Sequence, residues 1–512
     1  MVSDERPGRE RGRSLSLTVG KREATVRLLA LVTAVATSAL LMMSPVAAVA
    51  GPAHAKVAPT SAWGKSGPVP GLAALARSDD TVVNSVSCAS AGNCSAGGLY
   101  EFGTSCCLSR PFVASEVHGT WGQATEVPGL SALGPDGKAA VTSVSCPSAG
   151  SCTAVGYYTF GIESGGIADV SAFVVSQVKG TWGQAIEVPG LAALNTGGQA
   201  QLASVSCASA GNCTAGGSYG VPHGPGCCTA TGFVASQVNG TWGHARPVTG
   251  SGGISAVSCP SPGNCAAVGG VVVSQVKGAW RAPKTLIGPR GRKARISSVS
   301  CASAGNCIAG GVLPKTGAAV TAGEVKGAWG HVRAVTGLAS LLKGGDSTAT
   351  HSVFTQVSCT AAGQCTAGGY QDKSVEEGSS TRDYATPWVV SQRRGTWGSA
   401  QRIPGLGALS KNGYAIVTAV ACTAPGRCVV AAAYSTSSYN PDGSGPGQVF
   451  AASQIGGAWR AARKLSTPPS VDGPALVTSV ACPAVGQCVG GGYLWPSVPR
   501  GSRDAFVISQ AH

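Results

Sequence analysis

Short runs in which apolar and polar residues alternate recur along the whole chain. The segment Val141–Tyr158, "VTSVSCPSAGSCTAVGYY", holds two such runs around a small polar turn, and the runs "AFVVSQV" and "QAIEVPG" follow it. Alternation with a period of two over four to eight residues predicts β-strands rather than helices. Lys179-Gly180 stands between the last two runs, and an X-Gly pair supplies the positive φ of a two-residue hairpin. This segment is therefore predicted to form four antiparallel strands.

The same frame, with two cysteines separated by five residues, occurs eight times. The first cysteines of successive copies are 42 to 63 residues apart. The shortest spacing matches one four-stranded blade of a β-propeller, and the longer copies accommodate loop insertions. The 75 glycines and the aromatic content of 5% agree with many tight turns and few helices.

Tryptophans give an independent count of the repeats. In the first seven copies a Trp follows the X-Gly turn, whereas the eighth copy stops at "AFVISQAH". The missing piece lies at the other end, where "SAWGKSGPVPGLAAL" (Ser61–Leu75) matches "GTWGQAIEVPGLAAL" (Gly180–Leu194). A repeat divided between the two ends closes a ring and removes exposed sheet edges. The predicted fold is all-β, an eight-bladed β-propeller of four-stranded blades, closed by an N-terminal strand that completes the last blade.

The paired cysteines are predicted to form disulfides that close the hairpin between the first two strands. Facing residues on antiparallel strands lie within disulfide reach. Such short strands, rich in Gly and Ala, bury little apolar area, so each bridge acts as a staple of about 2–3 kcal/mol. Metal binding is the weaker alternative, because no histidine or second pair stands at zinc-finger spacing; neither a metal nor a cofactor is predicted. The predicted pairs are Cys88–Cys94, Cys146–Cys152, Cys207–Cys213, Cys259–Cys265, Cys301–Cys307, Cys359–Cys365, Cys422–Cys428 and Cys482–Cys488.

The N-terminus has the features of an export signal. Basic residues precede an apolar run from Leu28 to Met43, and Ala48-Val49-Ala50 fits a signal-peptidase site. We predict a signal peptide over residues 1–50 (alternatively cleaved after 55), a linker over 51–60 and the propeller over 61–512. A retained membrane anchor is the competing interpretation, but the apolar run is short for a span. The expected location is extracellular, in the medium or at the cell surface, with no transmembrane span after processing; twenty cysteines fit such an oxidising compartment.

The strand–turn–Trp segment S-x-x-x-G-x-W, as in Ser176–Trp182, resembles the Asp-box of sialidase-like propellers. The whole repeat, over residues 61–512, resembles secreted tandem-repeat β-propeller proteins of high-GC Gram-positive bacteria. Two departures limit the likeness. Valine replaces the Asp-box aspartate, as at Val117 and Val178, and the Trp stands one residue early. The resemblance therefore implies the blade and not sialidase chemistry.

The two faces of the predicted propeller differ. The loops from strand two to three and from strand four to the next blade carry the insertions and lie on one face, the loop face; the hairpin turns lie on the other, the turn face. Loops on a rigid scaffold carry function more often than the scaffold does. Two loops hold adjacent cysteines, which form either vicinal disulfides or bridges between loops or chains. A third holds the basic run "PRGRKAR". The candidate ligand residues are Cys106, Cys107, Cys227, Cys228, Arg290, Arg292, Lys293 and Arg295.

Catalytic patterns are sparse, and no catalytic residue is predicted. The seven histidines show no H-x-x-H spacing, and the loop acids are scattered. The net charge of +15, or +12 once residues 1–50 are removed, attracts anionic polymers, although such a charge also serves solubility alone. We predict an exported, non-enzymatic binding or scaffold module for a glycan or an anionic cell-wall polymer, with no specific nucleic-acid partner. The alternative is a glycan-processing hydrolase or lyase, which paired carboxylates in a pocket on the loop face would favour.

Overall fold

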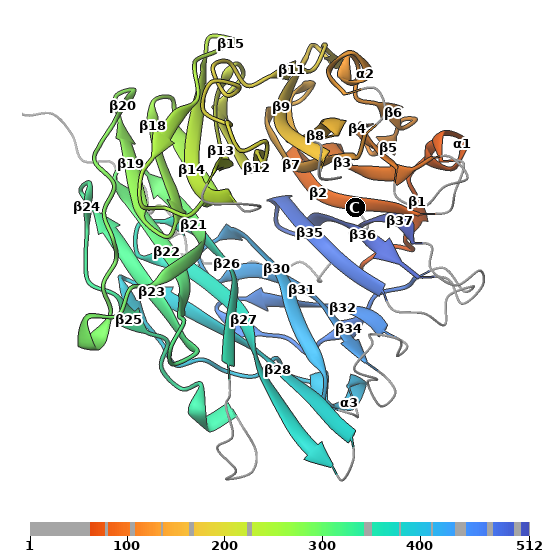
Figure 1. The fold of residues 1–512 in the computed structure, drawn as a ribbon. Helices are drawn as coiled ribbons and strands as arrows, with labels where there is room; N and C mark the ends of the chain where they lie inside the picture. The colour runs from red at the N-terminus through yellow and green to blue at the C-terminus, as the bar shows by residue number, and fades with distance from the viewer. Residues whose placement is uncertain are drawn as a thin grey trace, which may run out of the picture. The chain divides into compact units, whose positions relative to one another are not determined.

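The computed structural model (Figure 1) describes residues 62–510 apart from 77–79, 103–107, 135–136, 163–167, 223–227, 342–350, 378–379, 411–412, 436–446, 468–474 and 496–502. These residues belong to the compact unit Ala58–His512. The predicted signal peptide and the linker over 51–60 lie outside the described residues, as does the alternative cleavage position.

Eight antiparallel sheets form the blades, each from three longer strands and a short outer segment. Blade 1 comprises β2 (Thr81–Ser90), β3 (Asn93–Glu101), β4 (Ser109–Val117), β5 (Thr120–Trp121) and β6 (Thr125–Glu126). Blade 2 comprises β7 (Ala139–Ser148), β8 (Ser151–Ile162), β9 (Ala168–Val178), β10 (Thr181–Trp182) and β11 (Ile186–Glu187). Blade 3 comprises β12 (Gln201–Ser209), β13 (Asn212–Pro222), β14 (Cys228–Val238), β15 (Thr241–Trp242) and β16 (Arg246–Val248). Blade 4 comprises β17 (Ile254–Ser261), β18 (Asn264–Gly269), β19 (Val272–Val276) and β20 (Ala279–Trp280).

The second half repeats this plan. Blade 5 comprises β21 (Arg295–Ser303), β22 (Asn306–Leu313), β23 (Ala318–Val325), β24 (Ala328–Trp329) and β25 (Arg333–Ala334). Blade 6 comprises β26 (His351–Ala361), β27 (Gln364–Glu377), β28 (Ser380–Arg393) and β29 (Thr396–Trp397). Blade 7 comprises β30 (Ala415–Ala424), β31 (Arg427–Ser435), β32 (Gly447–Ile455), β33 (Ala458–Trp459) and β34 (Arg463–Lys464). Blade 8 comprises β35 (Ala475–Ala484), β36 (Gln487–Leu494), β37 (Asp504–Ser509) and β1 (Gly67–Pro68).

Blade 8 is built from both ends of the chain. β1 pairs antiparallel with β37, with Gly67 opposite Val507, and Trp63 forms a bridge with Gln510. Val69 and Leu72 are 2% and 3% exposed and pack in the apolar cluster between blades 8 and 1. In Figure 1 the blue strands of blade 8 lie beside the red strands of blade 1, and β35 contacts β2. The predicted eight blades and their closure by the N-terminal strand are confirmed.

The predicted hairpins are confirmed as well. The register places Cys88 opposite Cys94, and all eight Cys-x5-Cys pairs form disulfides with Cα–Cα distances of 3.9 to 4.1 Å. Lys179 and Gly180 have φ values of 51° and 84°, as a two-residue turn of this hand requires. The Gly180 N–H donates to the Gly150 carbonyl (2.8 Å), which joins this turn to the stapled turn of the same blade.

Serines before the first cysteine join the inner strands of neighbouring blades. Ser85 Oγ accepts from the N–H of Val144, and Ser87 Oγ accepts from the N–H of Cys146, each at 3.0 Å. Equivalent bonds join further pairs of blades, with donor nitrogens on Val205, Cys207, Val257, Cys259, Cys301, Val357, Cys359, Cys422 and Val86. The repeated V-S-C motif therefore satisfies backbone donors of the next blade, a role that its sequence position alone does not reveal.

The outer strand differs from the single fourth strand predicted. In blade 2 it is broken into β10 and β11, and between them the Ala185 N–H donates to the Pro128 carbonyl of blade 1 (2.7 Å). The outer segment thus leaves its own sheet to bond the neighbouring blade. The following Leu residues open short helical turns: α1 (Leu72–Leu75), α2 (Leu130–Leu133) and α3 (Leu406–Leu409), with 3-10 turns η1 (Pro289–Gly291) and η2 (Ala339–Leu341) elsewhere. The insertion that begins at Gln371 extends the β27–β28 hairpin.

Candidate functional site

The predicted ligand residues divide between described and undescribed parts of the loop face. Cys106, Cys107 and Cys227 lie outside the described residues. Cys228 begins β14, is exposed, and places its Sγ 3.1 Å from the Gly197 carbonyl oxygen. The question of vicinal disulfides or longer bridges therefore stays a prediction.

The basic run forms an ordered loop, here called the basic loop (residues 287–295), between blades 4 and 5. Its base is fixed by a hydrogen bond from the Ala294 N–H to the Leu286 carbonyl (2.9 Å), and both residues are buried. A second bond, from the Gly288 N–H to the Arg292 carbonyl (2.8 Å), closes its tip. Arg290 lies in the left-handed region with φ of 59°. The backbone of the basic loop is thus held by its own hydrogen bonds and by a buried base.

The cations of the basic loop are not neutralised by described neighbours. The side chains of Arg290, Lys293 and Arg295 are exposed, and Arg292 is half-buried. Within the described ranges, none of the four forms an ion pair. Arg292 Nη1 is buried and has no hydrogen-bond partner among the described residues. The basic loop therefore offers three exposed cations to an external anion, with Arg292 half-buried beside them.

A second charged group, the closure cluster, lies where blade 8 meets blade 1. Asp80 accepts two hydrogen bonds from the Arg503 guanidinium, at 2.6 and 2.5 Å, and the Arg503 Cζ lies 5.5 Å from the centre of the Tyr493 ring. Burial raises the pKa of Glu101, and the neighbouring Asp80 carboxylate raises it further. Asp80 is 6% exposed. Asp80 is therefore covered by Arg503 in a contact that joins the two ends of the described chain, and Glu101 lies beside it half-exposed.

The acids of the inserted loops do not gather. Of these loop acids, Asp169, Asp372 and Asp504 have described side chains, and they lie in blades 2, 6 and 8. Among the described residues, no group of three His, Cys, Asp or Glu side chains is arranged to hold a metal ion. Tyr158 is a buried phenol whose pKa burial raises to about 12, so it holds its proton at neutral pH.

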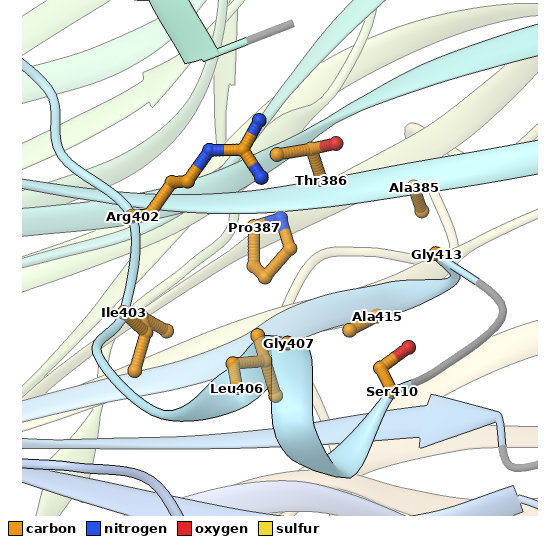
Figure 2. Close-up of a pocket in the computed structure, with 10 residues that line it drawn as sticks. All are labelled: Ala385, Thr386, Pro387, Arg402, Ile403, Leu406, Gly407, Ser410, Gly413 and Ala415. Atoms are coloured by element: carbon orange, nitrogen blue, oxygen red, sulfur yellow. The ribbon is translucent and has the colours of Figure 1, made fainter. Parts of the chain in front are cut away.

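Two cavities were not foreseen from the sequence. The smaller, ≈ 100 Å³, lies between β28 and α3 and is lined by Pro387, Ile403 and Leu406, with Arg402 at its edge (Figure 2). The Arg402 guanidinium donates to the Leu341 carbonyl, so its charge is partly engaged. This volume is well below the roughly 300–1,000 Å³ of ligand pockets. The larger cavity, ≈ 680 Å³, lies between blades 5 and 6 at the turn face and is called the blade 5/6 cavity.

Comparisons with known proteins add no assignment. No family model matches the chain, and no curated protein matches it. Similar solved structures include a protein of unknown function from Dyadobacter fermentans, with 9% identity over 71% of this chain and 92% of that one and a TM-score of 0.36. A PL25 polysaccharide lyase, an ulvan lyase, has 10% identity over 88% of this chain and 95% of that one, with a TM-score of 0.41. A puromycin hydrolase has 13% identity over 86% of this chain and 62% of that one, with a TM-score of 0.39. At these values the likenesses carry no statement about ligand or activity.

The cellular context is indicated by the cysteines. Eight disulfides suggest an oxidising extracellular environment. Among the helices that the structure describes, none is both long enough and apolar enough to cross a bilayer.

Proposed function

We propose that this protein is an exported, non-enzymatic binding module that holds an anionic polymer on its loop face through the basic loop. The observation that carries the proposal is the ordered basic loop itself, with four cations and no ion-pair partner among the described residues. Because the backbone is already fixed, binding orders side chains only, which lowers the entropic cost of association. The net charge of residues 51–512, +12, adds long-range attraction for a polyanion.

The covered closure cluster supports binding over glycan hydrolysis or cleavage. An acid–base pair acts on a substrate only when both carboxyl groups reach it. Asp80 is instead occupied by Arg503 and is 6% exposed. Freeing Asp80 for catalysis would break its contact with Arg503, which links the two ends of the described chain. The proposal therefore assigns this pair to closure.

The test removes the four cations together. The parent and a variant with Arg290→Ser, Arg292→Ser, Lys293→Ser and Arg295→Ser are compared on a heparin-like resin and on anionic wall polymer. The variant is expected to elute at lower salt. The slope of log affinity against log salt should fall by about one for each side chain that contacts the polymer.

The turn face offers a matched control. The variant Lys179→Asn, Lys277→Asn, Lys326→Asn removes three positive charges from exposed turns, at positions where blade 3 has Asn239 with φ of 48°. This control should elute close to the parent. Equal losses in both variants would mean that only net charge matters, and an unchanged basic-loop variant would place binding elsewhere; either result overturns the proposal.

A further inference from the structure

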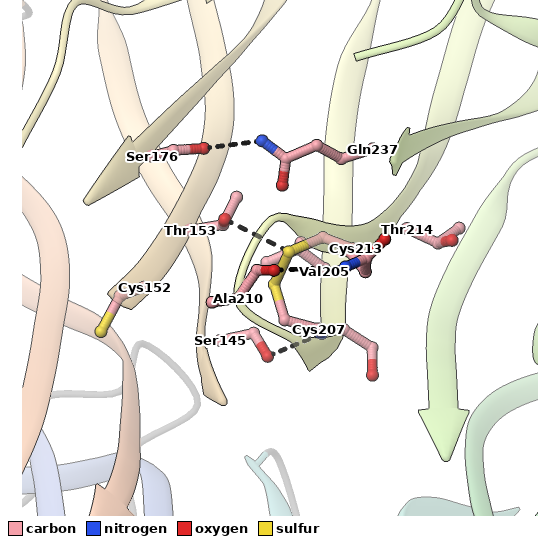
Figure 3. Close-up of a disulfide and its surroundings, with 12 residues drawn as sticks. Ser145, Cys152, Thr153, Ser176, Val205, Cys207, Ala210, Cys213, Thr214 and Gln237 are labelled. Atoms are coloured by element: carbon pink, nitrogen blue, oxygen red, sulfur yellow. Dashed lines mark hydrogen bonds between the residues drawn. A yellow bond between two sulfur atoms is a disulfide. The ribbon is translucent and has the colours of Figure 1, made fainter. Parts of the chain in front are cut away.

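At four junctions between blades, a glutamine of the third strand is held by a serine of the preceding blade. Gln237 Nε2 donates to Ser176 Oγ (3.1 Å) and to the Gly240 carbonyl of its own turn (3.1 Å), as Figure 3 shows for the first bond. The same contact joins Gln177 to Ser115, Gln275 to Ser236 and Gln454 to Ser391. The contact ties the third strands of neighbouring blades together close to the turn face.

The junction between blades 5 and 6 lacks this contact. Gly323 in β23 occupies the serine position, so Gln392 Nε2 donates only to the Gly395 carbonyl (3.1 Å) among the described residues. Gln392 is 7% exposed, and its Oε1 is buried without a hydrogen-bond partner in the described chain, as it is in Gln237, Gln275 and Gln454, so the missing bond of Nε2 is what sets this junction apart. The blade 5/6 cavity, ≈ 680 Å³, lies at this junction and is lined by both Gly323 and Gln392. Gly323 thus replaces the serine whose hydroxyl would accept a hydrogen bond from the Gln392 amide.

The lining of the cavity combines an apolar wall, a buried amide and a cationic rim. Ile308 and Trp397 supply apolar surface. Arg333 and Arg394 are exposed lining residues. Glu324 also lines the cavity, but its Oε1 accepts from Ser274 of blade 4 (2.6 Å), so its carboxyl group is engaged on the opposite side of the blade. The charged groups left at the cavity are therefore positive.

We propose that the blade 5/6 cavity binds a small acidic saccharide of one or two sugar units. A cavity of ≈ 680 Å³ lies within the roughly 300–1,000 Å³ typical of ligand pockets. The indole of Trp397 offers a flat apolar surface for the C–H face of a sugar ring. Gln392 Nε2 has a second N–H that can donate to a ring hydroxyl, and the two guanidinium groups match a carboxylate. This site lies on the turn face and does not depend on the function proposed for the basic loop.

The chemistry of the ligand is tested with three probes on the intact protein. D-glucuronate supplies ring hydroxyls and a carboxylate, D-glucose supplies hydroxyls alone, and acetate supplies charge alone. Ligand-observed NMR and calorimetry should detect glucuronate binding and give clearly weaker binding of glucose and acetate. No glucuronate binding at about 10 mM, the weak end for single small ligands, overturns the proposal. Equal affinity for glucose or for acetate overturns the acidic-sugar assignment.

The location is tested by restoring the repeat. Gly323→Ser places a Cβ 3.4 Å from Ile308 Cδ1, an ordinary contact, and supplies the missing hydroxyl to Gln392. This variant should keep or raise the unfolding midpoint and weaken glucuronate binding at least tenfold. Ser391→Gly, which removes the same hydroxyl at the junction of blades 6 and 7, should leave glucuronate binding unchanged. A folded Gly323→Ser variant with parental affinity overturns the proposed location.

A second variant keeps the test decisive if Gly323→Ser fails to fold. Arg394→Asn lies in an exposed turn at φ of 49°, where Asn239 shows that Asn is accommodated. It should weaken glucuronate binding up to about five-fold and leave glucose unaffected, as expected for a partly exposed ion pair. Lys277→Asn, at the equivalent turn of blade 4, should change neither. Parental glucuronate affinity in Arg394→Asn counts against the site.

Discussion

Leu72→Ala, compared with Leu130→Ala, tests the closure of the ring. Both leucines open a short helical turn after a glycine in the left-handed region: Gly71 has φ of 75° and Gly129 has φ of 79°. Leu72 is 3% exposed between blades 8 and 1, and Leu130 is 2% exposed between blades 1 and 2. The two substitutions therefore remove the same group from equivalent places, one at the closing junction and one within the continuous chain.

The structure predicts a similar cost at both sites. Truncating a buried leucine to alanine costs about 2–5 kcal/mol, because transfer energy is lost and a cavity remains. In a closed ring both variants should lower the free energy of unfolding by this amount and agree within about 1 kcal/mol. In an open ring Leu72 would lack the blade 8 wall, and its replacement would behave as a surface change, within roughly 0.5 kcal/mol of zero.

Guanidinium unfolding with the disulfides intact, followed by tryptophan fluorescence and far-UV circular dichroism, measures both values. The slope of the transition should be unchanged, so that the midpoint reports stability. A lowered midpoint for Leu130→Ala with a parental midpoint for Leu72→Ala would refute closure by the N-terminal segment.

Three further predictions follow from contacts described above. Non-reducing peptide mapping should recover eight intra-repeat pairs, beginning with Cys88–Cys94, and a pair between repeats would contradict the hairpin register. Burial raises the pKa of Glu324, so the folded protein retains a proton that the unfolded chain has released, and stability is lost as pH rises from about 4.3 through the raised pKa. Glu324→Gln should therefore gain stability relative to the parent as pH rises, and a pH-independent difference would contradict this. Ser145→Ala should cost about 1–2 kcal/mol, because the Cys207 N–H loses its acceptor, whereas the exposed Ser148→Ala should be neutral in the same unfolding assay.

Much of the fold could be predicted because each local signal occurs in several copies. The Cys-x5-Cys spacing, the X-Gly turns and the split repeat at Ser61–Leu75 all depend on contacts within one hairpin or on one comparison between repeats. The broken outer strand could not be predicted in this way, because the Ala185 N–H finds its acceptor on Pro128 of another blade. The glycine of strand β8 is similar: a Cβ on Gly156 would lie 1.9 Å from the Ala140 carbonyl oxygen, a clash that only the bulged register reveals.

The candidate sites were predicted less completely. The basic loop could be found from charge density, but its closed backbone depends on the bond between Gly288 and Arg292. The cysteines at 106, 107 and 227 are outside the described residues. The blade 5/6 cavity had a visible signal, since Gly323 stands where most repeats have serine. The sequence does not show that Gly323 and Gln392 line the same cavity. The two residues are distant in the chain and come close only through the packing of two blades.

The split blade also sets an order of assembly during synthesis. Each staple joins cysteines six residues apart, so a hairpin can be oxidised soon after it emerges, before later repeats exist. Gly67 is among the first described residues made, yet its partner Val507 is among the last. The N-terminal strand must therefore remain unpaired until β37 has been made, because that contact joins residues about 440 positions apart. A chain interrupted before Asp504 would carry its staples and still expose two sheet edges, and proteases can distinguish such an open ring from the closed one.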